Sequence, residues 1–316
     1  MKLRQAIEQY VAWRQSHGAS FATSACVLRQ FGRTLPEQTR CDGVTQNEAC
    51  RFLAGSGPLT RSRANRYGVL VGFYTYAISR GYAARTPLPA AEDEPRQPPS
   101  APPYVFSREE LQRLFACIGN SFRHAWRLDG DTFRTLLLLL YGAGLRRGEA
   151  LRLAVGDVDV GAALLTVRNT KFFKNRLVPI APQLADALRA YAALRAERPL
   201  PAGAASTFLA CLDGTPVCPA TAADAFSRLL AAAGIGRRDD GRRAPCLHSL
   251  RHTAAVHRVT AWYRRGADVQ RLLPALSTWL GHANLEGTKV YLSMTPELLQ
   301  QASLRFDHYV NGASHE

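Results

Sequence analysis

Apolar residues recur at helical spacing along residues 1–85, and this period predicts that the first part of the chain is all-helical. The first helix carries its apolar residues on one side: Ile7, Tyr10, Val11 and Trp13. A second stretch of the same period covers residues 21–31. Thr45 followed by Glu48 predicts the start of a third helix, because this spacing forms a capping box. A fourth helix is expected over residues 59–80.

The fourth helix changes character along its length. Its first half carries Arg61, Arg63 and Arg66, whereas its second half is apolar and aromatic. Such a helix can bury one end and place its arginines on DNA phosphates. The same pattern fits a basic helix end in solvent, and this stretch alone leaves both interpretations open.

Proline is dense in the stretch TPLPAAEDEPRQPPSAPPYVF, residues 86–106. Proline fixes the backbone angle φ and removes a hydrogen-bond donor, so this stretch predicts an extended linker. The linker divides the chain into an N-terminal part, residues 1–85, and a C-terminal part, residues 107–316.

The C-terminal part mixes helical and strand-like patterns. Ser107 with Glu110 forms another capping-box pair, and a long apolar helix is expected over residues 131–141. Residues 163–169 and 175–180 flank the polar tip TKFFKN, which predicts a β-hairpin. Further helices are expected over four ranges, about 183–196, 219–233, 249–265 and 268–280. Helices with one small antiparallel sheet indicate an α+β fold for this part of a mainly α protein.

The charge balance favours a polyanionic partner. The 316 residues include 40 Lys and Arg against 25 Asp and Glu, a formal net charge of +15 with a pI near 10.0. Such a balance favours nucleic acid over a membrane surface. Most of the cations are arginine, which suits bidentate phosphate contacts. A well-solvated basic surface explains the same numbers without any partner.

The seven cysteines are scattered along the chain and form no Cys-x-x-Cys pair. Their spacing argues against a disulfide framework and against a zinc site, and it fits a reducing cytosol. The N-terminus lacks the apolar stretch of a signal peptide. The most apolar run, Leu136 to Tyr141, is too short to cross a bilayer. We therefore expect a cytoplasmic protein with no membrane partner.

The stretch HSLRH places two imidazoles and a guanidinium within five residues. On a helix His248, Arg251 and His252 share a face, at spacings of three and four. A metal site would need a third ligand, usually a carboxylate, and the stretch has none. Taken alone, the motif fits a hydrogen-bonded pair of histidines beside a surface arginine equally well.

Two other stretches add cations. GAGLRRGEALRL brings Arg146 and Arg147 to a helix start, where anions are favoured, and Glu149 could hold a guanidinium in place. TKFFKNRLVPI places Lys171 at the tip of the predicted hairpin, a mount that can reach into a groove. Most lysines at the tip of a hairpin are only charged surface residues of an ordinary turn. Six residues in all are candidate DNA contacts: Arg61, Arg63, Arg66, Arg147, Lys174 and Arg176.

The last stretch is WLGHANLEGTKVYLSMTPELL, residues 279–299. Gly281 breaks a helix, His282 follows, and Tyr291 lies nine positions further on. Thr295 with Pro296 predicts the next helix start. Tyr291 therefore lies on a short segment between two helix boundaries, although a half-buried core tyrosine would look the same.

Together these stretches resemble the tyrosine recombinases, also called phage-type integrases. LRRGEALRL, TKFFKNRLVPI, HSLRH and LGHANLEGTKVY occur in the family's order, and TRSRANRYGVLVGFYTYAISRG resembles the family's core-binding domain. The likeness covers nearly the whole chain. The segment between Arg251 and His282 is longer than usual for the family, and Ser293 stands where histidine is frequent. Both departures fit a subgroup tied to mobile elements.

The resemblance implies a helical core-binding domain, residues 1–85, and a catalytic domain, residues 107–316. It implies six catalytic residues, with Tyr291 as nucleophile: Arg146, Lys171, His248, Arg251, His282 and Tyr291. Arg146 and Arg251 would clamp the scissile phosphate, and Lys171 would protonate the leaving oxygen. His248 is expected to accept the tyrosine proton, because imidazole titrates near neutrality.

The implied function is site-specific recombination of double-stranded DNA through a 3′-phosphotyrosyl intermediate, with neither metal nor nucleotide cofactor. Family members act as tetramers on two sites, and residues 303–316 would be the exchanged tail. Two alternatives stay open: a type IB topoisomerase and a non-catalytic DNA-binding regulator of the same fold. The sequence does not identify the target site or any accessory protein. It also does not distinguish integration from excision or resolution.

Overall fold

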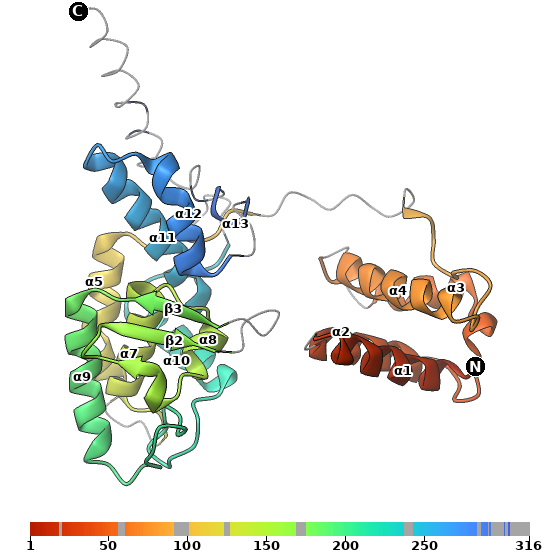
Figure 1. The fold of residues 1–316 in the computed structure, drawn as a ribbon, viewed down its shortest axis with the longest axis horizontal. Coiled ribbons are helices and arrows are strands. Elements are labelled where there is room, and N and C mark those ends of the chain that lie inside the picture. Colours follow the sequence, from red (N-terminus) through yellow and green to blue (C-terminus); the bar gives the residue numbers. More distant parts are fainter. Residues whose placement is uncertain are drawn as a thin grey trace, which may run out of the picture. The chain divides into compact units, whose positions relative to one another are not determined.

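The computed structural model describes residues 1–18, 21–55, 61–91, 101–122, 127–168, 175–236, 243–282, 286–289, 291, 300 and 303. These residues form two compact units, the first ending at residue 91 and the second beginning at residue 101 (Figure 1). Each unit has its own hydrophobic core. The fold class predicted from the pattern, mainly helical with one small antiparallel sheet, is confirmed.

The first unit is a bundle of helices. It contains α1 (Leu3–Ser16), α2 (Ala22–Arg33), α3 (Gln46–Ala54) and α4 (Arg61–Ser79), with the 3₁₀ turn η1 (Cys41–Gly43). The predicted capping box is present, since the Thr45 hydroxyl accepts a hydrogen bond from the Glu48 amide and the Glu48 carboxylate accepts one from the Thr45 amide. Ile7, Tyr10 and Val11 are buried, as their spacing predicts.

The second unit holds most of the secondary structure. Its helices are α5 (Arg108–Ala116), α6 (Ile118–Ser121), α7 (Gly130–Gly142), α8 (Arg147–Leu151), α9 (Pro182–Ala196), α10 (Pro219–Ala232), α11 (Leu247–Arg264), α12 (Val269–Leu280) and α13 (Glu286–Lys289), with the 3₁₀ turn η3 (Val155–Asp157). The helices predicted over 131–141, 183–196, 219–233, 249–265 and 268–280 are confirmed to within two residues at each end. The short helices α6, α8 and α13 have too few turns to give a periodic signal.

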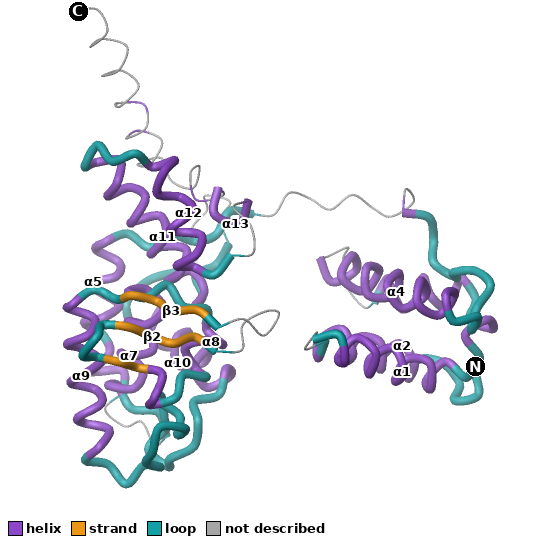
Figure 2. Tube along the Cα trace, viewed as in Figure 1, coloured by secondary structure: helices purple, strands orange, loops and turns teal. Residues whose placement is uncertain are grey.

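Three antiparallel strands form the small sheet, in the order β1 (Val158–Asp159), β2 (Leu164–Val167) and β3 (Arg176–Pro179) (Figure 2). The predicted hairpin is the β2–β3 pair, in which Leu165 lies opposite Val178. Leu165, Val167 and Val178 are buried in the core shared with α7. The tip of the hairpin lies outside the described residues.

Helix α7 lies at the centre of the second unit because its apolar residues face several neighbours. It packs against α11 and α9, and Leu136, Leu137 and Leu140 are almost completely buried. α12 packs against α11 and β3, and α13 packs against α12 (Figure 1). The end of α7, the start of α8 and the end of α12 are therefore brought together beside the first turns of α11.

Both ends of the proline-rich stretch belong to cores. Leu88 is buried in the first unit, whereas Tyr104 and Phe106 are buried in the second. The Tyr104 hydroxyl donates to the Glu110 carboxylate at 2.6 Å, and the Phe106 amide donates to the Thr253 hydroxyl at 2.9 Å. These residues are anchored, in contrast to the extended linker predicted for the whole of 86–106.

The helix start predicted at Thr295 and most of the predicted tail, residues 303–316, lie outside the described residues. In the part of the chain that is described, no helix combines the length and apolar character that a membrane span requires.

Candidate active site

The site begins at the N-terminus of α8. Arg146 is the residue that precedes the helix, as the sequence predicts, and the Glu149 side chain reaches back to accept a hydrogen bond from its amide at 2.9 Å. The Arg146 guanidinium donates to the other Glu149 oxygen at 2.7 Å and to the Gly281 carbonyl at 2.6 Å. The Arg146 side chain is 39% exposed, so its outer edge remains open to a ligand.

Glu149 is a buried acid that gathers three guanidiniums. Arg176, on β3, donates to both of its oxygens at 2.9 and 2.8 Å, and Arg251 lies 3.9 Å away. Burial acts to raise the pKa of Glu149, but hydrogen bonds from Arg176 and the Arg146 amide outweigh it and hold the pKa at about 2. Glu149 is therefore ionised at any physiological pH.

Arg251, at the start of the second turn of α11, is 1% exposed. Its two terminal nitrogens donate to the carbonyls of Gly144, after α7, and of Leu280, at the end of α12. Burial and then the positive charge of Arg146 lower its pKa to about 10, so the guanidinium stays protonated at neutral pH. The backbone of two neighbouring elements thus fixes this cation in one orientation.

Glycine is required beside both arginines. Gly144 has φ of +60°, and an added Cβ would lie 2.5 Å from the Trp279 ring. Gly281 has φ of +68°, and an added Cβ would lie 2.7 Å from the Arg176 guanidinium. A side chain at either position would combine backbone strain with a clash.

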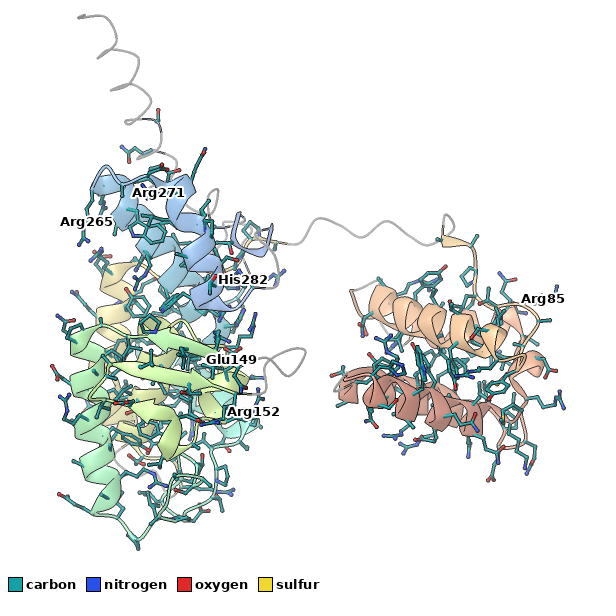
Figure 3. The ribbon with its side chains drawn as sticks, viewed as in Figure 1. Arg85, Glu149, Arg152, Arg265, Arg271 and His282 are labelled. Carbon is teal, nitrogen blue, oxygen red and sulfur yellow. The ribbon has the colours of Figure 1, made fainter. Side chains whose placement is uncertain are left out.

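Tyr291 follows α13 and is 2% exposed. Its hydroxyl lies 3.1 Å from His252 Nδ1, and its ring is nearly parallel to the His282 ring at 6.0 Å. His282 Nδ1 lies 2.7 Å from the hydroxyl of Thr288, a completely buried residue of α13. Figure 3 labels Glu149 and His282 on the same side of the second unit.

His248 lies one turn before His252 on α11. The two rings meet edge to face at 4.6 Å, and the His248 side chain is exposed whereas His252 is partly buried. The shared face predicted for HSLRH is therefore present. The imidazole within hydrogen-bonding distance of the Tyr291 hydroxyl is that of His252, whereas the sequence assigned the tyrosine proton to His248.

Burial and nearby cations set the ionisation of these groups. Burial, followed by His248 and Arg251, lowers the pKa of His252 to about 3, and burial with Arg251 lowers that of His282 to about 4. Burial also raises the pKa of the Tyr291 phenol, with Arg251 acting against it. Neutral imidazoles therefore face a protonated phenol, beside fixed guanidiniums.

The predicted site residues fall into three groups. Arg146, Arg251, His248, His282 and Tyr291 are brought together with Glu149 and His252. Lys171 and Lys174 lie outside the described residues. The remaining predicted DNA contacts are arginines of α4, α8 and β3.

These arginines differ in their surroundings. Arg147 is exposed and Arg63 is partly buried, while the Arg61 side chain is not among those described. Arg66 donates to the Phe52 carbonyl at 3.2 Å and lies over the Phe52 ring. Arg176 is 12% exposed, with both terminal nitrogens on Glu149. Arg66 uses one N–H on the Phe52 carbonyl and Arg176 uses both terminal nitrogens on Glu149, so a phosphate contact by either residue stays a prediction.

Sequence reasoning missed the backbone groups of the site. The carbonyls of Gly144, Leu280 and Gly281 hold the two arginines, and Thr288 holds His282. The glycine pattern was a usable signal, because both Gly144 and Gly281 precede or follow a predicted helix end. Among the described residues, no three His, Cys, Asp or Glu side chains gather as metal ligands would.

Comparisons with known proteins agree with this geometry. Residues 105–297 match the phage integrase family. The putative integrase/recombinase y4rE of Sinorhizobium fredii is 37% identical over 305 residues, which cover 96% of this chain and 95% of that protein. Tyrosine recombinase XerA of Thermococcus onnurineus is 31% identical over 308 residues, covering 95% of this chain and 94% of that protein.

The chain also resembles solved structures. The Tn1549 transposon integrase, in complex with transposon right end DNA, superposes with a TM-score of 0.69 at 16% identity. The match covers 98% of this chain and 99% of that one. At this level of identity the likeness shows a shared fold.

Proposed function

Because the chain belongs to the phage integrase family and is a tyrosine recombinase, we propose that it cuts and rejoins double-stranded DNA at specific sites. Each cut forms a 3′-phosphotyrosyl bond to Tyr291, and exchange proceeds through a Holliday junction. The S. fredii relative is named an integrase/recombinase and the Tn1549 protein a transposon integrase. Their names favour a recombinase that serves a mobile element.

The observation that carries the proposal is the position of the Tyr291 hydroxyl. The hydroxyl lies 3.1 Å from Nδ1 of His252, the residue that follows the buried Arg251 in the sequence. Glu149 contacts the guanidiniums of both Arg146 and Arg251. A phosphodiester bound by the two guanidiniums would have its phosphorus within reach of a phenolic oxygen. A structural tyrosine would not need two buried or half-buried cations beside its hydroxyl.

The arginines lower the barrier to attack. A phosphodiester is an anion that repels nucleophiles, and two fixed guanidiniums offset the charge on its non-bridging oxygens. His282, held by Thr288, adds a donor to the same phosphate. Charge stabilisation by preorganised groups supplies a large part of catalysis in such reactions. The guanidiniums carry the positive charge that a metal ion supplies in other phosphoryl-transfer enzymes.

The second half of the reaction reverses the first. Lys171 protonates the departing 5′ oxygen, and a 5′ hydroxyl of the partner strand later attacks the phosphotyrosine. The bond energy stays in the covalent intermediate, so the reaction needs no nucleotide cofactor. Four copies on two DNA sites, with residues 303–316 exchanged between neighbours, would complete the assembly.

Covalent capture of DNA tests the proposal. A pool of nicked duplexes, randomised around the nick, is incubated with the protein, and adducts that survive denaturation are recovered and sequenced. Wild type should enrich a defined sequence, whereas Tyr291→Phe should bind that sequence equally well and form no adduct. Equal adduct yields from the two proteins would refute Tyr291 as nucleophile. Relaxation of supercoiled plasmid without the selected sequence would favour a topoisomerase instead.

A further inference from the structure

We propose that His252, rather than His248, accepts the phenolic proton of Tyr291 during strand cleavage and returns it during rejoining. The inference rests on the proposed recombinase function and assigns one of its catalytic residues. His252 meets the condition for a catalytic base, since its ring nitrogen touches the oxygen that attacks phosphorus.

Geometry distinguishes the three histidines of the site. Among the described residues, His252 is the histidine whose ring nitrogen lies at hydrogen-bonding distance from the Tyr291 hydroxyl, 3.1 Å from Nδ1. His282 stacks on the phenol ring, and its Nδ1 is already bound to the Thr288 hydroxyl. The rings of His248 and His252 meet edge to face at 4.6 Å, and His248 is exposed, which suits a contact with the DNA phosphate instead.

The charges around His252 couple the proton transfer to DNA. His248, Arg251, Arg243 and His282 face this imidazole, and after burial itself they are what lower its pKa. A neutral His252 keeps a lone pair for the phenolic proton, but it is a weak base while the positive charges of Arg251 and Arg243 are uncompensated. A bound phosphodiester brings a negative charge beside Arg251, which raises the pKa of the imidazole. His252 therefore gains basicity when the substrate arrives.

The proposed step balances as follows. The phenolic proton of Tyr291 moves to His252 Nδ1, the phenolic oxygen forms a bond to phosphorus, and the bond from phosphorus to the 5′ oxygen breaks. The leaving 5′ oxygen takes a proton from Lys171. In rejoining, an incoming 5′ hydroxyl gives its proton to Lys171, and the imidazolium of His252 returns a proton to the departing phenolate.

The substitution His252→Asn tests the assignment. The asparagine amide oxygen can occupy the place of Nδ1 and accept the same hydrogen bond, but it cannot take a proton. The matched control is His248→Asn, the same change one turn earlier on α11. Both variants are compared with wild type on the nicked duplex selected by covalent capture, with DNA affinity and thermal unfolding measured alongside.

For His252→Asn we expect a loss of roughly 10²- to 10⁴-fold in the rate of adduct formation, with unchanged DNA affinity. The remaining rate should rise about tenfold per pH unit between about pH 7 and about pH 9, because the fraction of phenolate increases by that factor at any pH well below the pKa of the phenol, which burial raises further. Wild type and His248→Asn should show no such slope. A duplex with a sulfur in place of the bridging 5′ oxygen should not rescue His252→Asn, because a thiolate leaving group relieves only the need for an acid.

Several results would overturn the inference. If the rate of adduct formation rose steeply with pH in His248→Asn and not in His252→Asn, His248 would be the residue that accepts the phenolic proton. A loss in His252→Asn that is independent of pH and accompanied by a lower unfolding temperature would mean that the residue is only structural. Absence of any adduct from wild type would overturn the proposed function, and the assignment of His252 with it.

Discussion

Replacing Glu149 by glutamine should weaken the second unit more than any exchange of an exposed acid. Glu149 accepts hydrogen bonds from Arg146 and Arg176 and lies 3.9 Å from Arg251. Glutamine has the same shape but carries no charge. It would leave three guanidiniums near one another with no buried anion among them, and its amide would place two donors where the carboxylate accepted bonds.

The size of the effect follows from the pKa. Glu149 titrates at about 2 instead of 4.5. At about 1.4 kcal/mol per pH unit, this difference corresponds to about 3 kcal/mol of folding free energy at neutral pH. Removing one partner of a buried ion pair costs about 3–5 kcal/mol. We therefore expect Glu149→Gln to lower the free energy of unfolding of the second unit by about 3–5 kcal/mol.

The pH dependence has a definite sign. The pKa of Glu149 is depressed in the folded state, so the stabilisation by its carboxylate is fully present above about pH 4.5 and is lost as the pH falls toward about 2. The difference between wild type and Glu149→Gln should therefore be constant near neutrality and shrink across that acidic window. Subtracting the free energy of unfolding of Glu149→Gln from that of wild type at each pH cancels the contributions of the other carboxylates.

Urea unfolding of the full chain, followed by tryptophan fluorescence, measures the difference. Asp186→Asn is the matched control, because Asp186 also pairs with an arginine three residues away but is exposed on α9. This control should change the free energy of unfolding by less than about 1 kcal/mol. The reasoning is refuted if Glu149→Gln behaves like the control, or if its effect persists unchanged down to about pH 2.

The remaining predictions concern Gly281 and two of the predicted DNA contacts. Gly281→Ala should cost about 1–3 kcal/mol and slow adduct formation, because its Cβ would meet the Arg176 guanidinium at positive φ; wild-type behaviour in both assays would contradict this. Arg147→Ala should reduce the slope of log affinity for DNA against log salt by about one, since Arg147 is exposed. Arg66→Ala should leave that slope unchanged and destabilise the first unit by roughly 1 kcal/mol, because Arg66 is bound to Phe52. A reduced slope for Arg66→Ala together with an unchanged slope for Arg147→Ala would instead identify Arg66 as the phosphate contact.

The features predicted most accurately from the sequence are those formed by residues close together in the chain. Capping boxes at Thr45 and Ser107 depend on residues three positions apart, and both are present. The start of α8 at Arg146 follows from the preceding glycines and the nearby Glu149 in the same way. Such features need no tertiary information, because the interacting groups are neighbours along the chain.

The contacts that could not be predicted from the sequence join residues that are far apart in the chain. Arg176 looks like a surface cation of a hairpin, and its partner Glu149 lies 27 positions earlier on another element. His248 and His252 are equivalent on a helical wheel, so only the position of Tyr291 after α13 decides which ring meets the phenol. Side-chain spacing cannot reveal that a carbonyl such as that of Leu280 holds Arg251, because every residue has one.

Among the described residues of the site, the balance of charge explains the role of a single buried carboxylate, that of Glu149. Arg146, Arg176 and Arg251 share Glu149, and the neighbouring histidines are neutral, so these groups together carry an excess of about two positive charges. A second acid would remove that excess and repel a phosphodiester. Without any acid, the guanidiniums would repel one another and lose their orientation. With one, Arg251 and Arg146 are fixed by Glu149 and by backbone carbonyls, yet each keeps N–H donors for a ligand. If a DNA phosphate is the anion bound there, as proposed, its binding should stabilise the folded second unit and raise the basicity of His252 through the same guanidiniums.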